Sequence, residues 1–85
     1  MKLDTIPPTH VTADTVKRLV ARRYELMASA NRVPDSTGQG HVIKYSGTWM
    51  AQMLGVSRAY IGFLETGQKK MSLDHAQKYE AALKT

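Results

Sequence analysis

The stretch from Ser46 to Gly67 constrains the fold of this 85-residue chain more than any other part of it. It contains two apolar patterns with helical spacing, separated by Gly55, which can leave a helix at positive φ without steric strain. Ser46 and Ser57 precede the two patterns as N-caps, because a serine hydroxyl can accept a hydrogen bond from the first turn of a helix. The residues expected to face inward are Trp49, Met50, Met53 and Leu54 in the first pattern, and Ile61 and Leu64 in the second. The sequence therefore predicts two short helices joined by a tight turn at Gly55 and Val56.

The spacing of three residues in this stretch resembles that of a helix-turn-helix motif. Ala51, Gly55 and Ile61 are the fifth, ninth and fifteenth residues counted from Gly47. A small residue lets two helix axes approach, a glycine makes the bend, and a branched apolar residue anchors the second helix. Glu65 and Gly67 follow, and after them comes the basic run Gln68-Lys69-Lys70. With these residues the stretch resembles the Cro/CI type of repressor in particular. The resemblance covers residues 46–83.

This resemblance implies an all-α, lambda-repressor-like fold, a compact bundle of four to five short helices. It also implies a DNA-binding transcriptional regulator, most commonly a repressor that binds a palindromic double-stranded operator as a homodimer. The size and layout are also similar to the small Kor-type repressors of broad-host-range plasmids. An antitoxin or adaptor, which binds a partner protein and autoregulates its operon, is the alternative. Antitoxins commonly carry an extra tail that binds the toxin, so the absence of one after Leu83 favours the repressor. A protein co-regulator is a further possible partner.

The composition agrees with a nucleic-acid partner. Twelve Lys and Arg against seven Asp and Glu give a net charge of +5, and this charge attracts a polyanion. The chain has no cysteine, which excludes disulfides and thiolate metal sites, and its three histidines lack metal-ligand spacing. No grouping of a nucleophile with a histidine and an acid indicates catalysis. We therefore expect a cytoplasmic, non-enzymatic protein with no metal, cofactor or membrane span.

Residues 1–11 are expected to form an extended arm containing Pro7 and Pro8, and residues 12–85 the DNA-binding domain. The first helix is predicted from the N-cap Thr12 to about Ala30. Its expected buried stripe is Val16, Leu19, Val20, Tyr24 and Met27, and its expected solvent face is Lys17, Arg18, Arg22, Arg23 and Glu25. A last helix is expected after the N-cap Ser72, with its inward residues at Leu73, Ala76, Tyr79 and Leu83.

Residues 31–45 depart from the Cro/CI pattern, in which the first two helices are joined by a very short loop. Pro34, Gly38 and Gly40 exclude a helix through the middle of this inserted loop, and Val42-Ile43 can pack back as a short extended segment. Whether the loop contacts DNA, a partner subunit or nothing is left open. Since the family's fifth helix is missing, we expect the dimer interface to use the last helix, the arm and this loop.

The resemblance places the start and outer face of the second motif helix in the major groove. The base-contacting residues are then expected to be Ser57, Arg58, Ala59, Gly62 and Phe63. Arg58 can donate two hydrogen bonds to one guanine, and Phe63 can cover a thymine methyl group. The phosphate-contacting residues are expected to be Ser46, Gly47, Thr48, Thr66, Gln68, Lys69 and Lys70. Glu65 is expected to be structural and to accept hydrogen bonds from the loop after its helix.

Overall fold

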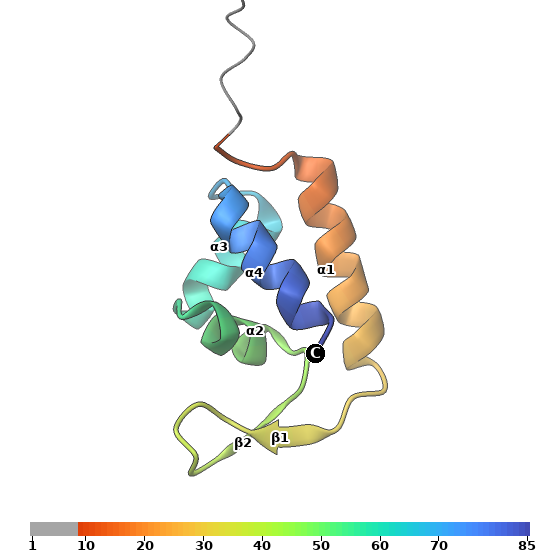
Figure 1. Cartoon of the computed structure of the whole chain (residues 1–85), viewed down its shortest axis with the longest axis vertical. Coiled ribbons are helices and arrows are strands. Elements are labelled where there is room, and N and C mark those ends of the chain that lie inside the picture. The colour runs from red at the N-terminus through yellow and green to blue at the C-terminus, as the bar shows by residue number, and fades with distance from the viewer. Residues whose placement is uncertain (1–8) are drawn as a thin grey trace, which may run out of the picture.

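The computed structural model describes residues 9–85, which fold into a helical bundle with a hairpin projecting from one end (Figure 1). The helices and strands of this part of the chain are α1 (Ala13–Met27), β1 (Arg32–Pro34), β2 (His41–Ile43), α2 (Gly47–Leu54), α3 (Arg58–Thr66) and α4 (Leu73–Leu83). The predicted compact bundle of four to five short helices is confirmed, with four helices in residues 9–85. None of these helices is long and apolar enough to cross a membrane.

Each helix begins at a hydroxyl residue whose side chain accepts a hydrogen bond from a backbone N–H in the first turn. The four N-caps are Thr12, Ser46, Ser57 and Ser72, as the sequence predicts. Gly55 ends α2 at a φ of 73°, and the N–H of Val56 donates to the carbonyl of Ala51 at 3.0 Å. The predicted turn between α2 and α3 is therefore confirmed.

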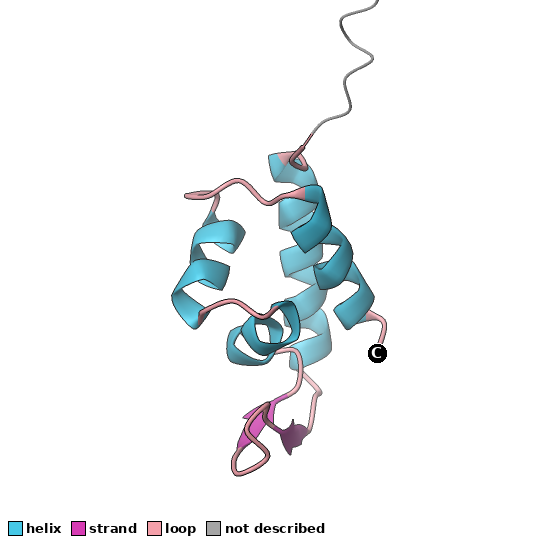
Figure 2. Ribbon diagram, turned by 60° about the vertical axis from the view of Figure 1, so that its left-hand side comes forward, coloured by secondary structure: helices cyan, strands magenta, loops and turns pink. Residues whose placement is uncertain are grey.

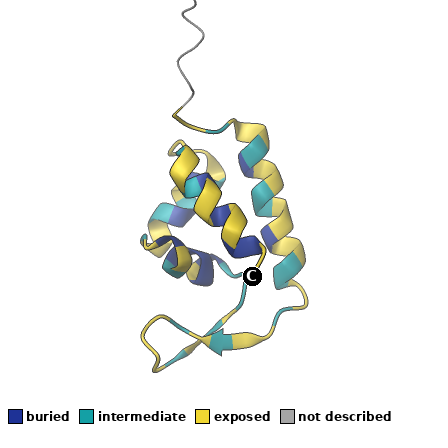
Figure 3. Cartoon of the chain, in the orientation of Figure 1, coloured by how far each residue is buried: buried dark blue, intermediate teal, exposed yellow. Residues whose placement is uncertain are grey.

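The core lies between α2, α3 and α4, with α1 packed along α3 and α4 (Figure 3). Its fully buried apolar residues include Met50 of α2, Ile61 and Leu64 of α3, and Tyr79 of α4. Ala51 is also buried, as expected for a small residue between closely packed helices. The residues that the sequence places on the inner side of α3 thus attach that helix to the bundle.

The predicted buried side of α1 is partly wrong. Arg23, expected in solvent, is only 2% exposed, whereas Tyr24, expected in the stripe, is 54% exposed. Arg23 is buried because it forms an ion pair inside the protein, and apolar periodicity does not detect ion pairs. The helix also ends at Met27 rather than near Ala30.

Two further residues predicted to face inward are exposed, Met53 and Leu73. The buried side of α2 is centred on Met50, Ala51 and Leu54, and helical geometry puts Met53 at the rim of that side. Leu73 is the first residue of α4, where the helix has not yet entered the core.

The inserted loop forms an antiparallel hairpin, which adds a small sheet to the expected all-α fold. Val33 pairs with Val42, and both pack against the core, whereas Ile43 is 42% exposed. At the tip, the Asp35 carboxylate accepts hydrogen bonds from the hydroxyl and N–H of Thr37 and from the N–H of Gly38. The hydrogen bond from the Thr37 hydroxyl is the main cause that lowers the pKa of Asp35, and the backbone hydrogen bonds lower it further. The expected extended segment at Val42-Ile43 is confirmed as β2.

The segment before α1 is attached to the loop before α4. His10 forms an isolated antiparallel bridge with Ser72, and the N–H of Val11 donates to the carbonyl of Met71 at 3.0 Å. Residues 9–11, expected in the arm, are therefore packed on the domain. The remainder of the expected arm, residues 1–8 with Pro7-Pro8, lies outside the described residues.

Candidate nucleic-acid interface

The outward side of α3 carries the residues that the sequence selects for base contact. Figure 2 shows the helices of the bundle and the loops that join them. Ile61 and Leu64 anchor the opposite side of the helix in the core. Phe63 is 39% exposed, so part of its ring is open to a partner. The exposed or half-exposed members of the expected set are Ser57, Arg58, Ala59, Gly62 and Phe63. The structure therefore brings all five together on α3 and its N-cap.

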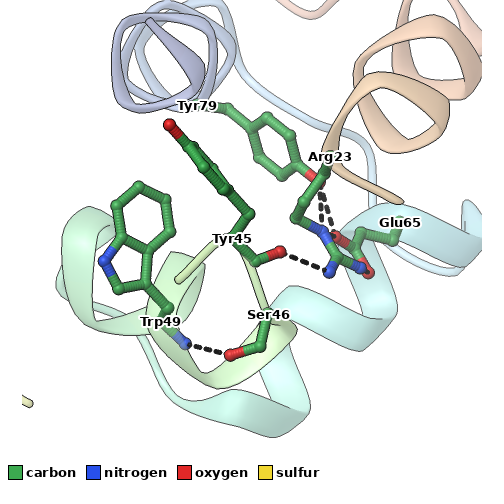
Figure 4. Close-up of polar contacts among 6 residues, drawn as sticks. All are labelled: Arg23, Tyr45, Ser46, Trp49, Glu65 and Tyr79. Atoms are coloured by element: carbon green, nitrogen blue, oxygen red, sulfur yellow. Dashed lines mark hydrogen bonds and ion pairs between the residues drawn. The ribbon is translucent and has the colours of Figure 1, made fainter. Parts of the chain in front are cut away.

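A buried polar network fixes α3 against the other helices (Figure 4). Arg23 of α1 donates to both carboxylate oxygens of Glu65, from Nε to Oε2 at 2.7 Å and from Nη2 to Oε1 at 2.8 Å. The Tyr79 hydroxyl of α4 donates to Oε2 of the same carboxylate at 2.6 Å. Glu65 is therefore structural, as expected, but its partners were predicted wrongly, because they lie on α1 and α4 and not in the loop after α3.

The same arginine extends the network to the start of α2. Its Nη1 donates to the carbonyl of Tyr45 at 3.1 Å. Tyr45 has a φ of 68°, an uncommon conformation for a residue with a side chain, and it directly precedes the N-cap Ser46. The ring of Tyr45 also packs edge-on against Trp49, with 5.1 Å between centroids. Arg23 thus holds the entry of α2 and the end of α3 in one fixed arrangement.

Burial and ion pairing act in opposite directions on Arg23. Desolvation by burial lowers its pKa, but the hydrogen bonds that Arg23 donates to Glu65 and the nearby negative charge outweigh it, so that the pKa of Arg23 is raised. Desolvation and the Glu65 carboxylate both raise the pKa of the Tyr79 hydroxyl. Both shifts favour the protonated forms, a charged Arg23 guanidinium and a neutral Tyr79 hydroxyl.

The first turn of α2 presents part of the expected phosphate-binding group. The Ser46 hydroxyl accepts from the N–H of Trp49 at 3.1 Å, and Thr48 is exposed beside it. Gly47 is buried, with the guanidinium of Arg58 where a side chain at this position would project. The structure thus leaves Ser46 and Thr48 accessible and places Gly47 under Arg58.

The end of α3 and the loop after it carry the other expected phosphate contacts, all of them exposed: Thr66, the last residue of the helix, and Gln68, Lys69 and Lys70 in the loop. Gly67 ends α3 at a φ of 85°, and the N–H of Lys69 donates to the carbonyl of Phe63 at 3.1 Å. The basic loop is therefore attached to the end of the helix. The Thr66 hydroxyl donates to the carbonyl of Gly62 at 2.8 Å, so its proton is already used within the protein.

Arg23, Tyr45 and Tyr79 support the interface, but sequence reasoning did not identify them as part of it. The available signal was an arginine seven residues after Val16, on the same side of the helix, together with an acidic residue on an otherwise basic surface. A buried acid and a buried base are normally paired, but the sequence alone does not show that these two residues are buried.

A family model for the helix-turn-helix matches residues 48–85. The match includes α3, α4 and all of α2 except its first residue, and it leaves α1 and the hairpin outside. It supports a helix-turn-helix DNA-binding regulator. No curated protein and no solved structure matches the chain. The resemblance to Kor-type plasmid repressors stays a prediction.

Proposed function

We propose that this protein is a sequence-specific transcriptional repressor that binds a palindromic operator as a two-fold dimer, with α3 in the major groove. The observation that carries the proposal is the division of α3 into two sides. Ile61 and Leu64 are fully buried, and Glu65 is held by the buried network, whereas the opposite side is exposed. A helix held rigidly on one side can present the other to a groove without losing further conformational entropy.

The side chains on the exposed side suit base edges. The Arg58 guanidinium can donate two parallel hydrogen bonds to O6 and N7 of guanine. Phe63 and the methyl group of Ala59 can contact the methyl group of thymine, which removes their apolar surface from water. Gly62 has no side chain and allows the backbone of α3 to approach closely, while the Ser57 hydroxyl keeps a proton to donate.

Two groups beside α3 suit the phosphate backbone. Lys69 and Lys70, with Gln68, follow the end of α3, and Ser46 and Thr48 are at the start of α2. Lysine charges and helix N-termini both attract phosphate, and such contacts set the register of a protein on DNA without selecting bases. The net charge of +5 adds long-range attraction.

Selection of bound sequences from a random DNA pool tests the proposal. The expected product is an inverted repeat whose half-sites lie about one helical turn apart, roughly 34 Å. Placing this sequence across a reporter promoter should lower transcription when the protein is supplied. An Arg58→Ala variant with normal folding should lose the selection at one base pair in each half-site. Failure to enrich any sequence would reject specific DNA binding, and activation of the reporter would reject the repressor.

A further inference from the structure

The guanidinium of Arg58 lies between two glycines from different helices. A Cβ built on Gly47 of α2 would be 2.6 Å from Cζ, 2.7 Å from Nη2 and 2.8 Å from Nε of Arg58. A Cβ built on Gly62 of α3 would meet Nη1 of the same side chain at 3.7 Å. The guanidinium therefore occupies the space of a missing side chain at position 47, and it makes only ordinary contact at position 62.

These distances predict different consequences for the two glycines. Separations below 3.0 Å are essentially never seen for real Cβ atoms, so an alanine at position 47 must displace the guanidinium. The displaced atoms are the far end of a flexible side chain, so the backbone need not move. An alanine at position 62 fits at van der Waals distance and leaves Arg58 where it is.

The space that Gly47 leaves open admits Arg58 to this position. Among the ion pairs of residues 9–85, none includes Arg58. Arg58 is the first residue of α3, and its guanidinium lies over the first turn of α2, so it is close to the positive ends of two helix dipoles. A planar guanidinium can lie flat on the backbone here because position 47 has no side chain.

We propose that Gly47 is a positioning residue that determines the base preference of Arg58. By leaving room for the guanidinium over the first turn of α2, it fixes the direction from which Arg58 approaches a base pair. A bidentate contact with guanine requires both the plane and the direction of the guanidinium to be correct. This inference rests on the proposed contact between α3 and DNA.

The test is a double-mutant cycle with Gly47→Ala and Arg58→Ala, measured on four operators that differ only at the base pair that Arg58→Ala identifies. Gly47→Ala should reduce the preference at that base pair by roughly 5- to 150-fold, the range for loss of one bidentate contact. In the Arg58→Ala background it should change the preference less than about twofold, because the two residues act through one contact. The melting temperature of the single variant Gly47→Ala should equal or exceed that of the wild type, since alanine is the better helix former.

The outcomes separate this inference from the proposed function. If Arg58→Ala changes the preference but Gly47→Ala does not, or if Gly47→Ala acts equally in both backgrounds, the positioning role is overturned and DNA binding by α3 stands. If the wild type binds no DNA, the proposed function fails. The effect of Gly47 on the position of the Arg58 side chain can then still be tested by NMR on the free protein. The NMR resonance of Arg58 Nε–Hε should then shift in Gly47→Ala and stay in place in the matched control Gly62→Ala. An unmoved resonance in Gly47→Ala overturns the inference.

Discussion

Arg23 and Glu65, which are 42 residues apart in sequence, form a two-point ion pair in the interior, with N–O distances of 2.7 and 2.8 Å. The pair joins α1 to the last turn of α3, and the Tyr79 hydroxyl completes it from α4. Charged groups are seldom buried unless they are paired, because removing each from water costs several kcal/mol. The orientation of the proposed DNA-contacting helix therefore depends on residues in the interior of the bundle.

Arg23→Ala should be strongly destabilising. It leaves the Glu65 carboxylate buried without its cation, and breaking a buried pair in this way costs about 3 to 5 kcal/mol. The neighbouring Arg22→Ala is the matched control, because Arg22 forms an exposed pair with Glu25 that contributes at most about 1 kcal/mol. The free energy of unfolding from urea titration measures both. Equal losses in the two variants would contradict the structural role of the buried pair.

The raised pKa of Tyr79 predicts that the protein loses stability in alkaline solution. Desolvation and the Glu65 carboxylate raise its pKa in the folded protein, whereas an unfolded tyrosine ionises near pH 10. The folded state therefore keeps a proton that the unfolded state loses, and the free energy of unfolding falls as the pH rises above about 10. Below that pH the contribution is constant.

Tyr79→Phe removes this titrating group. Its free energy of unfolding, although lower at neutral pH, should fall less between pH 10 and 12 than that of the wild type. Urea denaturation across this interval measures the difference, and Tyr24→Phe, which changes a tyrosine that is 54% exposed, is the control. Parallel curves for the wild type and Tyr79→Phe would show that ionisation of Tyr79 is not linked to unfolding.

The local features of the sequence predicted most of the fold. The N-caps, the turn at Gly55 and the inner side of α3 depend on short-range hydrogen bonds, backbone freedom and periodicity, which a sequence displays directly. The prediction placed Arg23 on the surface and Tyr24 in the core, and the structure shows the reverse. The reason is that the partners that bury Arg23 lie on α3 and α4. No local pattern contains that information.

The hairpin and the Arg58 contact were also beyond local patterns. Strand pairing of Val33 with Val42 spans a turn held by the Asp35 carboxylate. The sequence indicated a non-helical segment with a short extended stretch at Val42-Ile43, but not the strand with which it pairs. The position of Arg58 over Gly47 depends on the crossing of α2 and α3. The residues of the proposed interface could be chosen from sequence, but the contacts that orient them could not.

Lys69→Ala and Lys70→Ala should weaken binding to the selected operator and to random DNA by the same factor. Each lysine is proposed to neutralise one phosphate, so each substitution should reduce the slope of log K against log salt concentration by roughly 0.9. Fluorescence anisotropy over a series of salt concentrations measures the slope. Lys78→Ala on α4, where the lysine pairs with Asp74, should leave it unchanged. A loss confined to the selected operator would contradict a phosphate contact.

The proposed contact of Phe63 with DNA predicts that operator affinity depends on a thymine methyl group. If Phe63 contacts one, replacing that thymine by deoxyuridine should weaken binding by the wild type, because apolar contact with the methyl group is lost. Phe63→Ala should bind both operators equally. Met53→Ala, which shortens another exposed apolar side chain, should retain the wild-type discrimination. Equal binding of both operators by the wild type, at every thymine of the half-site, would exclude the contact.

The proposed dimer predicts an interface at the hairpin end of the molecule. Figure 1 places the hairpin and the C-terminal end of α4 at the same end of the bundle, while residues 9–11 lie at the other. The hydroxyl of Tyr45, which follows the hairpin, donates to the carbonyl of Thr85 at 3.1 Å, so these two segments are in contact. Ile43 is the exposed apolar residue of β2, and a symmetric dimer would bury it twice.

Ile43→Thr should therefore weaken dimerisation while leaving the affinity for an isolated half-site unchanged. Threonine keeps the β-branched shape that suits a strand but reduces the apolar surface, and the loss counts twice in a two-fold interface, so the dimer dissociation constant should rise roughly tenfold or more. Leu73→Thr, at the opposite end of α4, is the control and should have no such effect. Analytical ultracentrifugation with and without operator DNA measures assembly and stoichiometry. One protomer on a full palindromic site at saturation would refute the dimer, and a wild-type dimer unaffected by Ile43→Thr would place its interface elsewhere.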